Sequence, residues 1–129
     1  MKKRMNGRTL VLGILLASAG TLPVGAGEPI TMRVSPAVSF APANLIVRAT
    51  IPSDADNRAV EIIAESADFY RSSEVQLEGD KAARTTMFEF RSLPPGTYEV
   101  RATLIGANGT RGVVRQRVSV IPSGAGDQN

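Results

Sequence analysis

The 129-residue chain contains no cysteine and no histidine. Without cysteine it has no disulfide bond, no thiol nucleophile and no lipoprotein attachment site, so its core alone must hold the fold. Without histidine it lacks the commonest general base and the commonest metal ligand. Its one lysine outside the first three residues, Lys81, lies in a predicted loop. We therefore predict that the protein is not an enzyme, has no catalytic residues and uses no cofactor.

The carboxylates and the few aromatic residues add no catalytic or sugar-binding pattern. Glu61 and Glu65 face one side of a predicted strand, but four residues of strand span about 13 Å. The two carboxylates of a retaining glycosidase lie about 5 Å apart. The chain has no tryptophan, four phenylalanines and two tyrosines, and most of these aromatic residues are expected in the core.

Residues 1–26 have the pattern of a secretory signal peptide. Its basic residues come first: Lys2, Lys3, Arg4 and Arg8. Residues 10–19 are apolar, and residues 24–26 are small enough for cleavage. The apolar run is shorter than the ~20 residues of a membrane-spanning helix. We predict a periplasmic or secreted bacterial protein; cleavage after Ala19 and an uncleaved membrane anchor are the alternatives.

Removal of this segment changes the charge of the chain. The full sequence has 15 basic and 12 acidic residues, a net charge of +3. Four basic residues and no acidic residue leave, so 11 basic residues remain against 12 acidic ones. The remainder is predicted to form one domain, 27–122, and a flexible tail, 123–129. Its near-neutral charge gives no support for nucleic-acid binding, and the expected partner is another exported or cell-envelope protein.

Apolar and polar residues alternate with period two through most of the domain, which predicts strands. The seven predicted strands are 30–35, 44–51, 59–65, 74–78, 85–92, 97–105 and 112–121. Pro36 and Pro42 interrupt the pattern between the first two strands, as is typical at a sheet edge. The segment 66–73 has no clear pattern. A helix over 59–69 is the alternative for one segment, because its apolar residues also fit a 3.6-residue period.

The last two predicted strands form a hairpin, and their apolar residues predict its register. Both apolar sets face the core if Leu104 lies opposite Val114. That pairing leaves an odd-numbered loop around residues 108–110, with Gly109 at a positive φ.

This register also places polar residues. Arg101 lies opposite Arg117, a like-charged pair that a diagonal Glu99 must screen. Gln116 falls on the core side, so its amide needs a bulge or a backbone partner. The remaining outward-facing arginines alternate with glutamates and are interpreted as a solvated sheet surface that discourages edge pairing.

The stretch 93–100, LPPGTYEV, predicts a tight corner between two strands. Proline presets φ for a turn and glycine permits a positive φ, so Pro95 and Gly96 reverse the chain. The strand order and this corner resemble the immunoglobulin-like and fibronectin type III-like sandwiches of bacterial secreted proteins. The resemblance implies an all-β, seven-stranded antiparallel immunoglobulin-like sandwich in which Tyr98 hydrogen-bonds to nearby backbone.

The corner is also similar to that of carboxypeptidase regulatory-like domains, and the subfamily stays open. Val100 stands where an antibody domain has its second cysteine, and Pro94 stands where an acidic residue is common. Neither resemblance carries catalytic residues. From the whole chain we predict a small exported module for protein binding or assembly that acts by surface complementarity. A protein that binds calcium or a polysaccharide is the alternative.

Asp54, Asp56 and Asn57 are the candidate metal ligands. Alternate acidic residues in a loop can converge on calcium, which takes six to eight oxygen ligands. The stretch lacks the glycine and the distal bidentate glutamate of calcium loops. The competing interpretation, which we favour, is a turn in which these side chains bond local backbone. We therefore predict no metal site.

Phe69, Tyr70 and Arg71 are the candidate partner contact. Two adjacent aromatic residues and an arginine cannot all point into the core, and tyrosine and arginine are enriched at binding hot spots. The competing interpretation is that Phe69 closes one end of the core and Tyr70 covers it with its hydroxyl in water.

Overall fold

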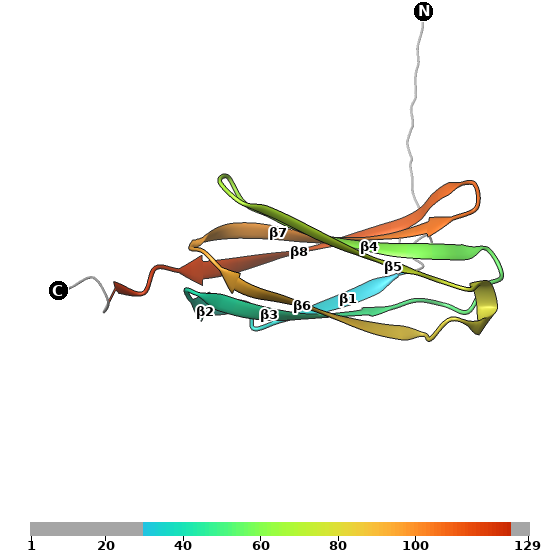
Figure 1. Ribbon diagram of the computed structural model, residues 1–129, viewed down its shortest axis with the longest axis horizontal. Helices are drawn as coiled ribbons and strands as arrows, with labels where there is room; N and C mark the ends of the chain where they lie inside the picture. The colour runs from blue at the N-terminus through green and yellow to red at the C-terminus, as the bar shows by residue number, and fades with distance from the viewer. Residues whose placement is uncertain (1–29, 125–129) are drawn as a thin grey trace, which may run out of the picture.

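The computed structural model describes residues 30–124, and these residues are almost entirely β-structure (Figure 1). The strands are β1 (Thr31–Ser35), β2 (Val38–Phe40), β3 (Ala43–Thr50), β4 (Asn57–Glu65), β5 (Tyr70–Gln76), β6 (Thr85–Leu93), β7 (Gly96–Gly106) and β8 (Gly109–Ile121). One short 3-10 helix, η3, spans Gly79–Lys81. The all-β prediction is confirmed. The predicted signal peptide and residues 125–129 of the predicted tail lie outside the described residues.

The strands form two sheets that pack face to face (Figure 1). Sheet A has the order β1-β3-β6, and sheet B has the order β2-β8-β7-β4-β5. The prediction of seven antiparallel strands is wrong in two respects. Residues 30–124 contain an eighth strand, β2, and it pairs in parallel with β8. The prolines on either side of β2 concealed this three-residue strand, because proline is usually a sign of a broken ladder.

The core lies between the two sheets and consists of alternate residues from both. Sheet A contributes Val34, Leu45, Val47, Ala49, Phe88 and Phe90, and sheet B contributes Val60, Ile62, Tyr98, Val100, Leu104, Val118 and Val120. The chain has no cysteine, so burial of these side chains is the main source of stability.

The structure decides the two uncertain segments. The 59–69 region holds a strand and not a helix, because β4 pairs with both β5 and β7. The strand predicted over 74–78 is displaced: β5 begins at Tyr70 and ends at Gln76. Polar residues on both faces of this edge strand removed the alternation that would have revealed its start.

The β7–β8 hairpin has the predicted core face but a different register. Leu104 lies opposite Gly112 instead of Val114, and a two-residue loop joins the strands. The predicted odd-numbered loop is wrong because the register shifts beside Leu104, where Arg111 is the extra residue of a β-bulge. Gly109 has the predicted positive φ, +121°.

The changed register gives Arg101 a different arginine opposite it, and Glu99 still screens the pair. Arg101 lies opposite Arg115, not Arg117. Glu99 screens the pair as predicted, because one carboxylate oxygen accepts from Arg101 Nη1 at 2.8 Å and the other lies 3.6 Å from Arg115 Nε.

Gln116 links the two sheets through its side-chain amide. Its Oε1 accepts a hydrogen bond from the Val34 backbone nitrogen at 3.1 Å, and its Nε2 donates to the Val34 carbonyl at 3.1 Å. The predicted backbone partner is therefore present. The amide satisfies the free edge of β1 as a neighbouring strand would.

Candidate functional site

The acidic turn between β3 and β4 closes around Arg111. The Arg111 Nη2 donates to Asp54 Oδ2 at 3.0 Å, and its Nη1 donates to Asn57 Oδ1. The Arg111 Nε lies 3.7 Å from Asp56 Oδ2. The three candidate metal ligands are thus brought together, but a guanidinium group lies where a cation would bind. Within residues 30–124, no group of three or more acidic side chains has a metal-binding arrangement.

The same carboxylates also hold the local backbone. Asp54 Oδ1 accepts a hydrogen bond from the Asp56 backbone nitrogen at 2.7 Å, and Asp56 Oδ1 accepts one from Ala107 at 3.1 Å. The hydrogen bond from Asp56 is the main reason that the pKa of Asp54 lies below its usual 3.8; burial opposes this effect and the charge of Arg111 adds to it. The carboxylates of Asp54 and Asp56 are therefore occupied by Arg111 and by local backbone nitrogens.

Two further residues explain why the β7–β8 hairpin fits against this turn. A Cβ at Gly106 would lie 2.5 Å from Asp56 Oδ2 and 2.6 Å from Arg111 Cδ, so any other residue would displace these two side chains. Asn57 is fully buried and donates to the Pro52 carbonyl at 2.9 Å while it accepts from Arg111. We call Asp54, Asp56, Asn57 and Arg111 the Arg111 cluster.

The corner between β6 and β7 is held by Tyr98. Its side chain is buried, and its hydroxyl donates to the Pro94 carbonyl at 2.7 Å, the kind of bond that the resemblance implied. Pro94 and Pro95 lie between the two strands, and Gly96, the first residue of β7, has a φ of +157°. Burial raises the pKa of the Tyr98 phenol above its usual 10.0.

The three residues of the candidate partner contact do not form one surface. The Phe69 ring meets Tyr98 edge-on, with centroids 6.2 Å apart. The Arg71 guanidinium lies 5.0 Å from the centroid of the Phe69 ring and donates to the Arg91 carbonyl at 2.7 Å. Arg71 therefore joins the edges of β5 and β6, and of the three residues Tyr70 has the most exposed side chain, at 57 %.

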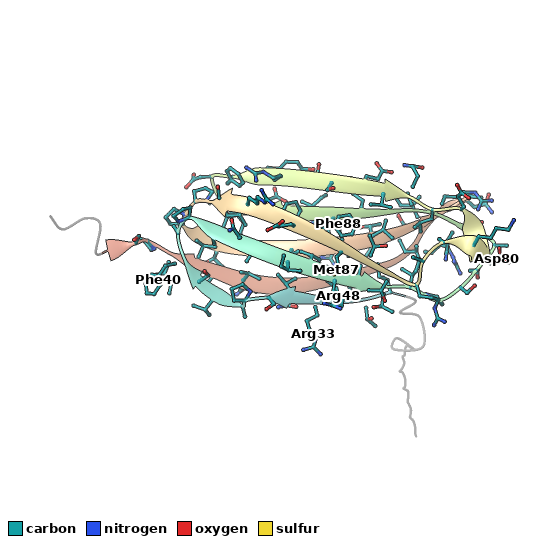
Figure 2. The ribbon with its side chains drawn as sticks, turned by 60° about the horizontal axis from the view of Figure 1, so that its bottom comes forward. Arg33, Phe40, Arg48, Asp80, Met87 and Phe88 are labelled. Carbon is teal, nitrogen blue, oxygen red and sulfur yellow. The ribbon has the colours of Figure 1, made fainter. Side chains whose placement is uncertain are left out.

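A group of exposed apolar residues lies at one corner of sheet B, on residues that the sequence analysis did not single out. Val38 and Phe40 on β2 are 59 % and 66 % exposed, and Ile121 at the end of β8 is 39 % exposed. Phe40 lies opposite Ile121 in the ladder, and Figure 2 shows Phe40 projecting away from the strands. We call these three residues the apolar corner. Alternation alone could not locate it, because apolar residues of a strand are expected to face the core.

Two hollows on the surface of residues 30–124 are relevant to binding. One, of about 450 Å³, lies beside η3 and is lined by Ala55, Arg58, Leu77, Glu78, Gly79, Asp80 and Lys81. The other, of about 390 Å³, lies on the outer face of sheet A and is lined by Arg33, Ser35, Ile46 and Arg48. Among the described residues, no helix is long and apolar enough to cross a membrane.

Comparisons with known proteins define the fold and no family. No family model matches the chain, and no curated protein matches it. A family 76 glycoside hydrolase from a bovine Bacteroides thetaiotaomicron strain is similar with a TM-score of 0.52 and 21 % identity, over 73 % of this chain and 20 % of that one. The chain therefore spans about a fifth of the length of that enzyme.

Superoxide reductase (neelaredoxin) from Ignicoccus hospitalis is similar over most of its length. In one structure the TM-score is 0.56 and the identity 14 %, over 74 % of this chain and 82 % of that one. In another the TM-score is 0.51 and the identity 12 %, over 74 % and 81 %. At such low identities the similarity concerns the two-sheet architecture alone.

Proposed function

We propose that the protein is an exported, non-catalytic module of immunoglobulin-like type that binds or assembles with another exported protein. The packing of the β1-β3-β6 sheet on a five-stranded sheet centred on β7 supports this type, and so does the hydroxyl bond of Tyr98. The pattern of residues 1–26 supports export.

The apolar corner carries the proposal of protein binding. Contiguous exposed apolar residues on a soluble protein often mark an interaction surface, and a buried aromatic anchor is a common hot spot. Phe40 offers such an anchor. β2 is also the terminal strand of sheet B and pairs with β8 on one side, so a partner strand can add on its other side.

The alternative ligands receive less support. The guanidinium group of Arg111 already forms ion pairs with Asp54 and Asp56 and lies where a cation would bind. We therefore expect no shift in the melting temperature at millimolar calcium, and a clear rise would restore the calcium hypothesis. The two exposed aromatic residues, Phe40 and Tyr70, lie on β2 and β5, the opposite edges of sheet B, and form no platform for a sugar.

We also propose that this chain has no enzyme activity. The similar proteins include a glycoside hydrolase and a superoxide reductase, but the chain has no histidine and no cysteine, which bind redox metals most often. Arg111, Asp54 and Asp56 are engaged in structural contacts at the Arg111 cluster.

Substitution of Phe40 tests the binding surface. Tagged wild-type protein, Phe40→Ser and Met87→Ser are exposed to a cell-envelope extract, and the captured proteins are compared by mass spectrometry. Met87 is 56 % exposed on sheet A, so Met87→Ser removes a similar apolar area elsewhere. We expect Met87→Ser to capture the wild-type set and Phe40→Ser to lose it. Capture of the full set by Phe40→Ser would show that the corner is not the binding surface.

Two additions make the test more specific. Tyr70→Ala asks whether the other exposed aromatic residue contributes to the same capture. Analytical ultracentrifugation of wild-type protein and Phe40→Ser shows whether the partner is a second copy of this chain, in which case only the wild type associates as its concentration rises.

A further inference from the structure

The outer face of sheet A brings two arginines together. Arg33 on β1 lies directly opposite Arg48 on β3, and Arg48 lies opposite Met87 on β6. The next row on the same face contains Ser35 and Ile46. Figure 2 shows Met87, Arg48 and Arg33 following one another across this face. Like charges directly opposite each other on a ladder repel, so the pair lowers the stability of the isolated protein.

No acidic group of the described chain relieves this repulsion. Arg33 and Arg48 make no side-chain hydrogen bond or ion pair with any residue in 30–124. The strands β1 and β3 carry no acidic residue. The carboxylate of β6 on this face, Glu89, is 3.2 Å from Arg91 Nη2 and is therefore already paired.

Sheet B contains a comparable pair of opposed arginines that is screened by a carboxylate. Arg101 and Arg115 also lie opposite each other, on β7 and β8. There Glu99 places one oxygen 2.8 Å from Arg101 and the other 3.6 Å from Arg115. One oxyanion with two oxygens thus serves two guanidinium groups. The pair on sheet A has the same cross-strand arrangement without its anion.

We propose that Arg33 and Arg48 bind a phosphate group on the outer face of sheet A. The hollow of about 390 Å³ between them is large enough for this group, and the Ser35 hydroxyl lines it as a further donor. Planar guanidinium groups suit the oxygens of phosphate, and a phosphomonoester carries a charge of about −1.5 to −2 at neutral pH, which balances two arginines. Ile46 lines the hollow and offers apolar surface to the rest of the ligand.

Inorganic phosphate is the first probe, at constant ionic strength maintained with sodium chloride. We expect it to raise the melting temperature of the wild type saturably and to shift the Nε–Hε NMR signals of Arg33 and Arg48. Acetate at equal ionic strength is the comparison ion. An equal response to acetate would mean a general anion surface and would overturn the phosphate assignment.

Arginine substitutions separate binding from folding. Without phosphate, Arg33→Gln and Arg48→Gln should melt at or above the wild-type temperature, because each removes the repulsion. Both should lose the response to phosphate. Arg115→Gln is the matched control, since it removes an outward arginine from the screened pair, and it should keep the response. A full phosphate response in Arg33→Gln and Arg48→Gln would overturn the proposal.

A vesicle experiment identifies the carrier of the phosphate group. Sedimentation with phosphatidylcholine vesicles that contain phosphatidic acid, but not with phosphatidylcholine alone, would identify a lipid headgroup, provided that Arg33→Gln abolishes it. A response to inorganic phosphate without vesicle binding would identify a soluble phosphate compound. The apolar corner lies on sheet B, so Phe40→Ser should leave all of these results unchanged, and the two proposals can fail separately.

Discussion

At the scale of single residues, Tyr98 has the most predictable role in the chain. Its place two residues after Gly96 predicted a corner, and its hydroxyl donates to the Pro94 carbonyl at 2.7 Å. Tyr98→Phe removes that bond and should lower the free energy of unfolding by about 1 kcal/mol, the usual effect of one buried hydrogen bond. Urea denaturation at pH 7 measures the change. Unaltered stability would mean that the hydroxyl does not hold the corner.

The same residue predicts a response to alkaline pH. Burial raises the pKa of the Tyr98 phenol above 10.0, so the folded state favours the neutral form. The resulting stabilisation is complete below pH 10 and is lost as the pH rises through the folded-state pKa. Melting temperatures between pH 9 and pH 11 should therefore fall more steeply for the wild type than for Tyr98→Phe. Tyr70→Phe, at an exposed tyrosine, should follow the wild type.

Asp54 predicts the opposite response, at acidic pH. The pKa of Asp54 lies below 3.8, chiefly because its carboxylate accepts the Asp56 backbone hydrogen bond. Its stabilisation is present above that value and is lost as the pH falls through the folded-state pKa. Asp54→Asn should be less stable than the wild type at pH 6, and the difference should shrink toward pH 3. Asp68→Asn, at an exposed position, serves as the control for removal of one charge.

At the scale of elements, strict alternation closely located the strands of sheet A and the central strands of sheet B, but not β2 and β5, the two edge strands of sheet B. β3, β4, β6 and β7 bury one face against the other sheet, so their sequences carry the period-two signal. β2 turns Val38 and Phe40 outward, and β5 is polar on both faces, so neither has that signal. The bulge at Arg111 could not be predicted from alternation either, because Arg111 contacts Asp54, which lies 57 residues away in sequence.

Gln116 gives a prediction for the contact between β1 and β8. Gln116→Leu removes both hydrogen bonds to the Val34 backbone and should lower the free energy of unfolding by about 1–2 kcal/mol. It should also raise the exchange rate of the Val34 amide, while amides of the β4–β7 ladder keep their protection. Gln76→Leu, on the exposed edge strand β5, is the matched control. Unchanged exchange at Val34 would show that water replaces the glutamine without loss.

At the scale of the whole molecule, the sandwich separates its features in space. The apolar corner and the Tyr98 corner lie at one end, and the Arg111 cluster lies at the other, where the β3–β4 turn meets the β7–β8 hairpin (Figure 1). The unpaired arginines occupy the outer face of sheet A. Composition showed in advance that a small cysteine-free chain needs one apolar core. It could not show which polar residues would meet, since sheet packing brings distant segments together.

Processing of the whole chain is a further prediction. If the exported protein is cleaved after Ala26, its mass corresponds to residues 27–129 and its net charge changes from +3 to about −1. Intact-mass spectrometry of protein recovered from the periplasm or medium measures the mass, and isoelectric focusing measures the change in net charge. A full-length mass would show that the N-terminal segment is not removed.

The parallel pairing of β2 with β8 has a mechanical consequence. β1 and β2 are the first strands of the described chain, and β8 is the last. Because β2 and β8 run in parallel, a force that pulls residues 30 and 124 apart slides β2 and β8 past each other. The bonds from Ser119 to Ala37, at 2.9 Å, and from Ala41 to Ile121, at 2.8 Å, then bear the load together. Bonds loaded together in shear must break together, whereas bonds loaded in an unzipping direction break singly. The β2–β8 contact should therefore resist stretching along the strands more strongly than an antiparallel contact pulled open from one end.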